Sequence, residues 1–155
     1  MKIKTLLFAG IALGLTSTAS AQIGKGATEL GGSITNVQGD DFDLTYIVGN
    51  AGYFLTDNFQ ILASAFLGES DGNTFGSFGP GVSYYFMNAN STFFPYVGAS
   101  YQLDLSDEGG DDSIEINGGA KFPVNERTTL NAQIALQDDD SGTTIQTSLG
   151  ISFFF

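Results

Sequence analysis

The sequence predicts an all-β fold, an eight-stranded antiparallel up-and-down transmembrane β-barrel, from three observations. First, apolar and polar residues alternate with a period of two, as in half-buried strands. Second, eight such segments have about the ten residues that a tilted strand needs to cross a bilayer. Third, the chain ends on the aromatic-rich segment Thr143 to Phe155. Such an edge aggregates unless the sheet closes or meets lipid, and a membrane barrel does both.

The first half of the barrel contains two irregular positions. In the second segment Tyr46 and Val48 are expected on the apolar face, and the period falters at Gly49 to Gly52, where we expect a bulge. In the fourth segment Pro80 cannot donate to a ladder, so we expect a bulge there too. The first four strands are predicted at residues 27–37, 42–55, 59–68 and 75–86.

The second half shows the alternation more clearly. Ile114 and Ile116 oppose Glu115 and Asn117, and the last segment has an outer apolar row ending at Phe155. Acidic runs follow the odd-numbered segments and short turns follow the even-numbered ones, which indicates long extracellular loops and short periplasmic turns. The last four strands are predicted at residues 93–105, 113–122, 128–137 and 143–155.

The N-terminus has the pattern of a secretory signal peptide. Lys2 and Lys4 precede an apolar core of about ten residues, too short to cross a hydrocarbon layer of about 30 Å. A small-residue site ends at Ala21. We therefore predict a signal peptide over residues 1–21, cleaved after Ala21, and a barrel domain over residues 22–155.

The composition excludes several functions. After cleavage Lys25, Lys121 and Arg127 face 17 acidic residues, so the net charge is 3 − 17 = −14, which argues against a nucleic-acid partner. Without Cys the chain has neither disulfides nor a lipid-modified cysteine. It also has no His, the usual general base at neutral pH, so we expect no enzyme, although a tuned carboxylate could substitute.

The apolar face is expected to meet lipid. The polar face carries many amides and few charges, whereas the strands of a soluble barrel would be rich in Lys and Glu. Aromatic residues such as Phe59, Tyr84 and Phe122 gather near strand ends, as in an interfacial girdle. The alternative is a soluble periplasmic barrel with its apolar face lining a ligand cavity.

Several stretches carry a family resemblance: ATELGGSITNV, DLTYIVGNAGYFLTDNFQILASAFLG, GPGVSYYF, FPYVGASYQL and the closing Phe155. With these the chain resembles the outer-membrane β-barrel-domain family of OmpX and the OmpA transmembrane domain, over essentially the whole mature chain. GYFLTDNF, Gly52 to Phe59, is the most specific part.

The resemblance implies a location in the outer membrane of a Gram-negative bacterium, in contact with lipid and lipopolysaccharide. It also implies that the barrel-assembly machinery recognises the last strand, with Ile151, Phe153 and Phe155 as the signal. Because no segment follows the barrel in this sequence, we do not expect the peptidoglycan-binding domain of OmpA.

Three charged residues are expected in the lumen, namely Glu29, Glu115 and Lys121. An eight-stranded barrel is just wide enough to be filled by side chains, and buried charges need partners. We therefore predict a plug of ion pairs and amide hydrogen bonds. A narrow or gated ion path remains the alternative.

The acidic connections are candidate sites for Ca²⁺ or Mg²⁺, which prefer carboxylate oxygens. None has the spacing of an EF-hand loop, and acidic loops are usually just solvated. No other cofactor is expected. The residues concerned are Asp107, Glu108, Asp111, Asp112, Asp138, Asp139 and Asp140.

Together these observations predict a monomeric barrel with a structural or surface-interacting role, exercised through acidic extracellular loops. A narrow porin-like channel for small ions or solutes and a soluble periplasmic ligand-binding barrel are the alternatives.

Overall fold

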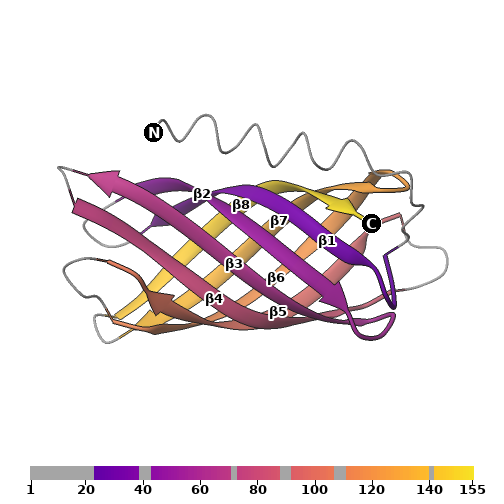
Figure 1. Cartoon of the computed structure of the whole chain (residues 1–155), viewed down its shortest axis with the longest axis horizontal. Helices are drawn as coiled ribbons and strands as arrows, with labels where there is room; N and C mark the ends of the chain where they lie inside the picture. The colour runs from indigo at the N-terminus through magenta and orange to yellow at the C-terminus, as the bar shows by residue number, and fades with distance from the viewer. Residues whose placement is uncertain (1–22, 39–42, 71–72, 88–91, 107–110, 140–141) are drawn as a thin grey trace.

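The computed structural model describes residues 23–38, 43–70, 73–87, 92–106, 111–139 and 142–155. In this part of the chain eight antiparallel strands form a closed barrel in sequence order, which confirms the predicted fold (Figure 1). The predicted signal peptide and its cleavage site at Ala21 lie outside the described residues. The strands are β1 Thr28–Gln38, β2 Asp43–Phe54, β3 Phe59–Ser70, β4 Asn73–Tyr85, β5 Phe94–Asp104, β6 Ser113–Asn125, β7 Thr128–Asp139 and β8 Gly142–Phe154.

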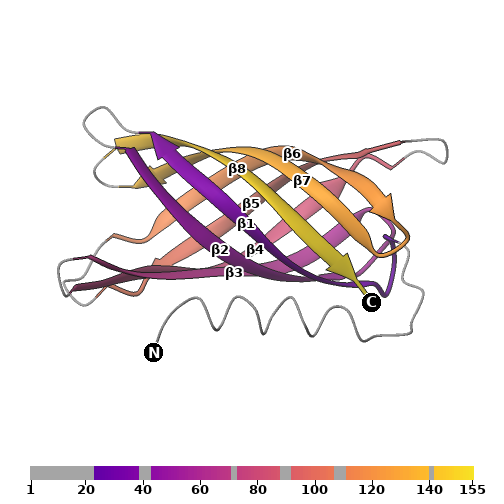
Figure 2. The same ribbon diagram turned by 90° about the horizontal axis from the view of Figure 1, so that it is seen from above.

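The last strand closes the barrel against the first. β8 pairs antiparallel with β1, with Leu30 opposite Phe153 and Ile34 opposite Leu149, and the two strands lie side by side in Figure 2. Hydrogen bonds between Thr28 and Phe155 continue this pairing past the end of β8. Each strand therefore has two neighbours, and the sheet presents no free edge to lipid.

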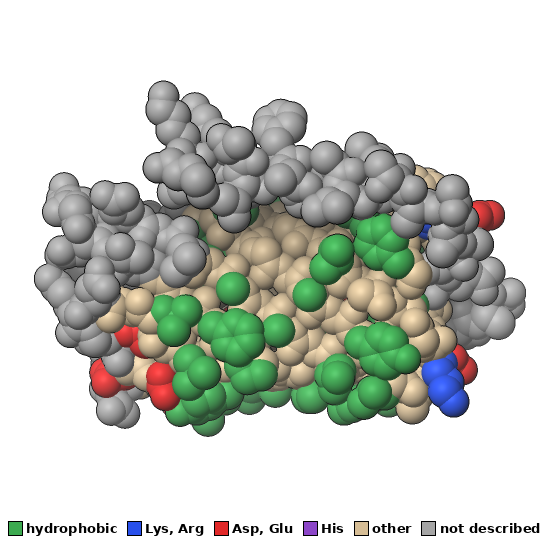
Figure 3. Space-filling view, viewed as in Figure 1, with side chains coloured by type: hydrophobic (Ala, Val, Ile, Leu, Met, Phe, Trp, Pro, Cys, Tyr) green, Lys and Arg blue, Asp and Glu red, His purple; other side chains and the backbone are tan. Residues whose placement is uncertain are grey.

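The outer wall is apolar. Ile34, Ile116 and Leu149 are 58, 62 and 70% exposed, and hydrophobic side chains cover the wall between charged groups at the two ends (Figure 3). An apolar surface of this extent on a closed barrel is stable in lipid rather than in water. The apolar phase faces outward, so the alternative of a soluble barrel with an apolar cavity is wrong. No helix in the described residues is long and apolar enough to span a membrane.

Outward-facing aromatic rings gather at one end of this wall. Tyr84 contacts Phe86 edge-on with ring centroids 5.3 Å apart, and Phe93 stacks on Phe122 at 5.9 Å. All four side chains are exposed. Their position matches the aromatic girdle that transmembrane barrels place at the membrane interface.

The prediction for β2 was wrong in phase. Tyr46 and Val48 line the lumen, while Ile47 is exposed on the outer wall. The pairing of β2 with β1 runs without a register shift from Asp43 to Tyr53, so there is no bulge at Gly49 to Gly52. The outward positions in that stretch are Gly49 and Ala51. Because neither carries a large apolar side chain, the alternation of apolar and polar residues is not visible there.

The bulge predicted at Pro80 was also wrong, because the register on either side of this residue is the same. The ladder between β4 and β5 is instead interrupted: Phe78 pairs with Leu103 and Gly81 with Ser100, but Gly79 and Pro80 have no partners on β5. Proline lacks the N–H that the ladder needs. In the described residues a register shift occurs between β6 and β7, at Pro123 to Asn125.

The connections differ from the expected alternation of long loops and short turns. Several strands continue into the acidic segments, so β3 ends at Ser70 just before β4 begins at Asn73, and Asp138 and Asp139 belong to β7. We call the end of the barrel where β1 joins β2 and β7 joins β8 the loop end. The opposite end, which carries Lys25 and Phe155, is the turn end.

Candidate functional site in the barrel lumen

The lumen contains a cavity of about 380 Å³. It extends from Asp111 and Asp139 at the loop end down to Glu29 and Lys121 near the turn end. Its walls are inward-facing Ser, Thr, Asn and Gln side chains of all eight strands, as the alternation of each strand requires. Most of the residues that line the cavity are therefore polar, and we call this cavity the vestibule.

A layer of buried aromatic side chains lies in the lumen toward the turn end. Phe54, Tyr85 and Phe154 are at most 1% exposed and Tyr96 is 7% exposed. Ring centroids are 5.1 Å apart between Phe54 and Tyr85, 5.2 Å between Tyr85 and Tyr96, and 6.4 Å between Phe54 and Phe154. These four residues, from β2, β4, β5 and β8, were not predicted as a site. The sequence feature that could have identified them is an aromatic residue at a position that alternation assigns to the polar, inward face, near the turn end of a strand.

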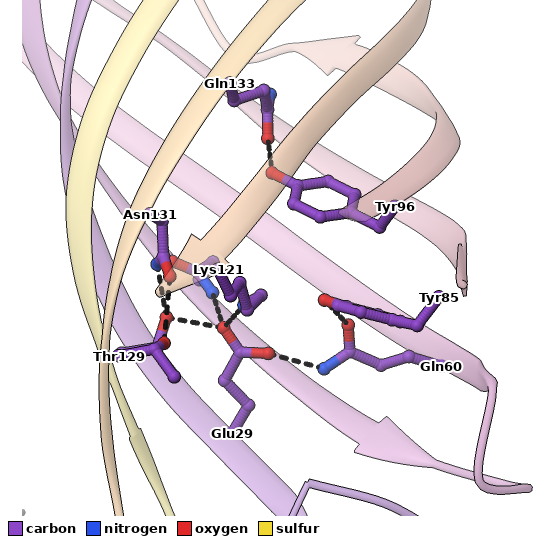
Figure 4. Close-up of polar contacts among 10 residues, drawn as sticks. Glu29, Gln60, Tyr85, Tyr96, Lys121, Thr129, Asn131 and Gln133 are labelled. Carbon is purple, nitrogen blue, oxygen red and sulfur yellow. Dashed lines mark hydrogen bonds and ion pairs between the residues drawn. The ribbon is translucent and has the colours of Figure 1, made fainter. Parts of the chain in front are cut away.

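Directly above the aromatic layer lies a buried ion pair. Glu29 of β1 and Lys121 of β6 contact each other through Oε1 and Nζ and are 1% and 5% exposed. Gln60 Nε2 donates to Glu29 Oε2 at 2.7 Å, and Ser152 Oγ donates to Glu29 Oε1 at 2.5 Å (Figure 4). The Glu29 carboxylate thus accepts hydrogen bonds from β3, β6 and β8, and a longer one of 3.4 Å from Asn50 Nδ2 of β2.

Further contacts surround the pair. Tyr85 Oη donates to Gln60 Oε1 at 3.0 Å, and Asn131 Nδ2 donates to Ser152 Oγ at 2.6 Å. Lys121 Nζ lies 5.5 Å from the ring centroid of Phe154, 5.8 Å from Tyr85 and 6.0 Å from Tyr96, within range of cation–π attraction. A buried pair satisfied in this way specifies one packing of the lumen, and removing either partner leaves an uncompensated charge.

The structure brings Glu29 and Lys121 together, but it places Glu115 elsewhere. Glu115 faces the vestibule from the loop-end half of β6 and accepts a hydrogen bond from Asn117 Nδ2 at 2.8 Å. Its register neighbours are Ser100 on β5 and Gln137 on β7. The predicted lumen residues therefore form two separate features.

The described acidic residues of the loop end make local hydrogen bonds. Asp112 accepts from Tyr101 Oη at 2.9 Å and from the Asp104 backbone N at 3.1 Å. Asp138 accepts from Thr143 Oγ1 at 2.8 Å, and Asp139 from the Gly142 backbone N at 3.0 Å. Within the described residues no three acidic side chains are grouped to hold a metal ion. The other candidates, Asp107, Glu108 and Asp140, lie outside those residues.

The proposed assembly signal is on the outer wall. Ser152 and Phe154 point inward and are buried, whereas Ile151, Phe153 and Phe155 are in the opposite phase and partly exposed. Recognition by the barrel-assembly machinery remains a prediction.

No family model and no curated protein matches the chain. Among solved structures, the N-terminal β-barrel domain of Pseudomonas aeruginosa OprF is similar with a TM-score of 0.65 and 21% identity, over 85% of this chain and 99% of that one. The chain has the fold of a bacterial outer-membrane barrel. The outer-membrane protein OprG of Pseudomonas aeruginosa matches with a TM-score of 0.58 and 15% identity, over 86% of this chain and 98% of that one.

A third similar structure is Ail, the attachment invasion locus protein of Yersinia pestis, with a TM-score of 0.53 and 14% identity, over 84% of this chain and 99% of that one. These likenesses agree with the barrel fold that the sequence and the family resemblance predict. At these identities they concern the fold of the barrel.

Proposed function

We propose that the protein is a closed barrel of the Gram-negative outer membrane with a structural or surface-interacting role, rather than an open pore or an enzyme. One observation supports this proposal: two successive layers of buried side chains lie in the lumen near the turn end. The Glu29–Lys121 pair forms the upper layer and the aromatic layer forms the lower one.

An ion that crossed the barrel would have to separate this pair and then pass the aromatic rings. Lys121 reaches from β6 to Glu29 on β1, so the pair crosses the lumen. Removing one partner from a buried ion pair lowers the stability of a protein by about 3–5 kcal/mol. Passage would then still require displacement of Phe54, Tyr85 or Phe154, which are fully packed.

The charge distribution supports a surface role. The loop-end segments contain 13 of the 17 acidic residues and neither Lys nor Arg. At the turn end Lys25 and Arg127 balance Asp57 and Glu126. The loop-end acids are Asp40, Asp41, Asp43, Glu69, Asp71, Asp104, Asp107, Glu108, Asp111, Asp112, Asp138, Asp139 and Asp140.

This charge determines the kind of partner that we propose. Ail has been solved with the heparin analogue sucrose octasulfate, which is a polyanion. The acidic loop end of this barrel would repel such a ligand and attract a basic one. The proposed partners are therefore a basic protein surface, or lipopolysaccharide bridged by divalent cations, contacted by a monomeric barrel.

Conductance in planar bilayers tests the closed lumen. We expect no sustained open states from the refolded protein. Lys121→Met should lower the unfolding temperature, because Glu29 loses its counter-ion, without opening a channel, because the aromatic layer remains. Adding Phe54→Ala and Phe154→Ala to this variant should raise the conductance and serves as the positive control. Sustained open states of the unmodified protein, or a large conductance gain from Lys121→Met alone, would favour the pore.

A further inference from the structure

A carboxylate in the vestibule has no ion-pair partner among the residues that the structure describes. Glu115 is partly buried, and its one hydrogen-bond donor among the described residues is Asn117 Nδ2 at 2.8 Å. Lys121, the basic residue that lines the same cavity, is engaged by Glu29. Placing a carboxylate in a low-dielectric site without a cationic partner is costly. A ligand that supplied the positive charge would offset that cost.

The residue beside Glu115 has an unmet hydrogen-bond acceptor. Asn117 Oδ1 is a buried side-chain atom without a hydrogen-bond partner in the described part of the chain. Native proteins leave few such atoms, and each calls for a water, an ion or a ligand. Turning the amide by half a rotation would bring Oδ1 beside the Glu115 carboxylate. That arrangement becomes favourable when a cation lies between the two oxygens.

Two tyrosine rings also line the vestibule. Tyr46 stacks on Phe66 with centroids 4.3 Å apart and donates to Gln146 Oε1 at 3.3 Å. Tyr96 donates to Gln133 Oε1 at 2.7 Å. Both tyrosines line the vestibule with Glu115. Tyr46 is half-buried and Phe66 covers one face of its ring, so the other face is the one that a positively charged ligand can contact.

The remaining charges that line the vestibule are Asp104, Asp111 and Asp139 toward the loop end and the Glu29–Lys121 pair at its base. A cleft lined by one sign of charge between low-dielectric walls concentrates counter-ions. Cations from the loop end are therefore drawn toward Glu115.

We propose that the vestibule binds a small organic cation, a protonated aliphatic amine, with its ammonium group between Glu115 and Asn117. An ammonium fits better than a metal ion, because the described residues offer no group of three acidic ligands but do offer amide oxygens and tyrosine faces. The cavity volume of about 380 Å³ lies within the range of small-molecule sites. Binding at this site requires the vestibule but not the plug. The proposal is therefore independent of whether the lumen is closed to ions.

Nuclear magnetic resonance of the refolded, isotope-labelled protein in nanodiscs tests the site. The probe is 1,4-diaminobutane and the matched neutral control is 1,4-butanediol. We expect the diamine, and not the diol, to shift the Asn117 side-chain amide signal in a saturable way. Glu115→Gln should weaken this binding by about tenfold, since it removes the charge that pairs with the ammonium. Asp138→Asn, which removes a charge outside the cavity lining, should leave the binding nearly unchanged.

Three outcomes would overturn the proposal. The first is that the diamine has no effect on the unmodified protein. The second is that it binds Glu115→Gln equally well, which would indicate unspecific attraction to the acidic end. Alternatively Mg²⁺ or Ca²⁺ could give the saturable shift while the diamine does not, which would indicate a metal site. If Glu115→Gln fails to fold, the comparison of diamine with diol on the unmodified protein still shows whether the vestibule binds an ammonium group. In that case Tyr46→Leu, which removes one ring face, should weaken the diamine binding.

Discussion

Gly52 makes room for the contacts of the Glu29 carboxylate. A Cβ atom at this position would lie 2.3 Å from Gln60 Nε2 and 2.8 Å from Gln60 Cδ. Gln60 Nε2 is the atom that donates to Glu29, and Gln60 Oε1 accepts from Tyr85. The amide cannot move aside without breaking at least one of these bonds, so the lumen packing requires a glycine here.

Gly52→Ala is therefore expected to destabilise the barrel by about 1–3 kcal/mol, the usual cost of overpacking a filled interior. The matched control is Gly49→Ala on the same strand, where the nearest atom to an added Cβ is the Ala65 carbonyl oxygen at 3.9 Å. That change should be nearly neutral. Urea unfolding of the refolded proteins in vesicles measures both. Equal midpoints for the two variants would show that Gln60 is free to move.

The sequence allowed the lumen charges to be predicted but not their partners. Glu29, Glu115 and Lys121 stand on the polar phase of their strands, so period-two alternation places them inside. Which of them meet depends on the stagger of eight strands around the barrel, and this brings together residues 92 positions apart. Phe54 and Phe154 were missed because their apolar side chains stand on the phase that otherwise marks polar residues.

At the level of elements, the weak point of the sheet is the β4–β5 ladder. Leu105 N donates to Gly76 O and Phe86 N to Pro95 O, both at 2.9 Å. In an antiparallel ladder every second pair of opposed residues exchanges backbone hydrogen bonds. Pro80 stands opposite Tyr101 in this register, an even number of residues from both of these bonds, so this pair is one that should be hydrogen-bonded. Pro80 has no N–H to give, so the Tyr101 carbonyl lacks its donor within the lipid-facing wall, where an unpaired carbonyl is costly.

Pro80→Val should complete this ladder and stabilise the protein by about 1 kcal/mol, the net value of one hydrogen bond. The urea midpoint should rise, and the amide hydrogens of residues 80 and 101 should exchange slowly. Pro123→Val is the control, because Pro123 lies exposed near the turn end, where water can satisfy a carbonyl. If Pro80→Val raises the urea midpoint no more than Pro123→Val does, the missing N–H of Pro80 is not what interrupts the β4–β5 ladder.

Strand existence and face were predictable for most elements because the alternation is regular. The loop lengths could not be predicted. Runs of Asp, Ser and Thr indicate a loop in a sequence, but antiparallel pairing can continue through them beyond the membrane into water. Asp138 pairs with Thr143, and Asp139 with Gly142, in such an extension.

At the scale of the whole molecule, backbone pairing all the way around the barrel predicts resistance to detergent. The protein isolated from the outer-membrane fraction should keep its fold in sodium dodecyl sulfate until it is heated, and the unheated band should migrate faster on a gel. A sheet in which the first and last strands pair leaves the detergent no free strand edge to attack. Recovery from the soluble periplasm, without a heat-dependent shift, would contradict the lipid-facing wall.

The contacts of Glu29 also bear on how the chain folds. Its donors come from β3, β6 and β8, and Asn50 Nδ2 of β2 lies at 3.4 Å. A folding intermediate without β8 lacks the Ser152 donor and leaves the end of the lumen open to water, so the carboxylate gains its full stabilisation only when the first and last strands meet. The pair thereby couples closure of the sheet to packing of the interior. Partly closed forms of the barrel are disfavoured, and folding becomes more cooperative.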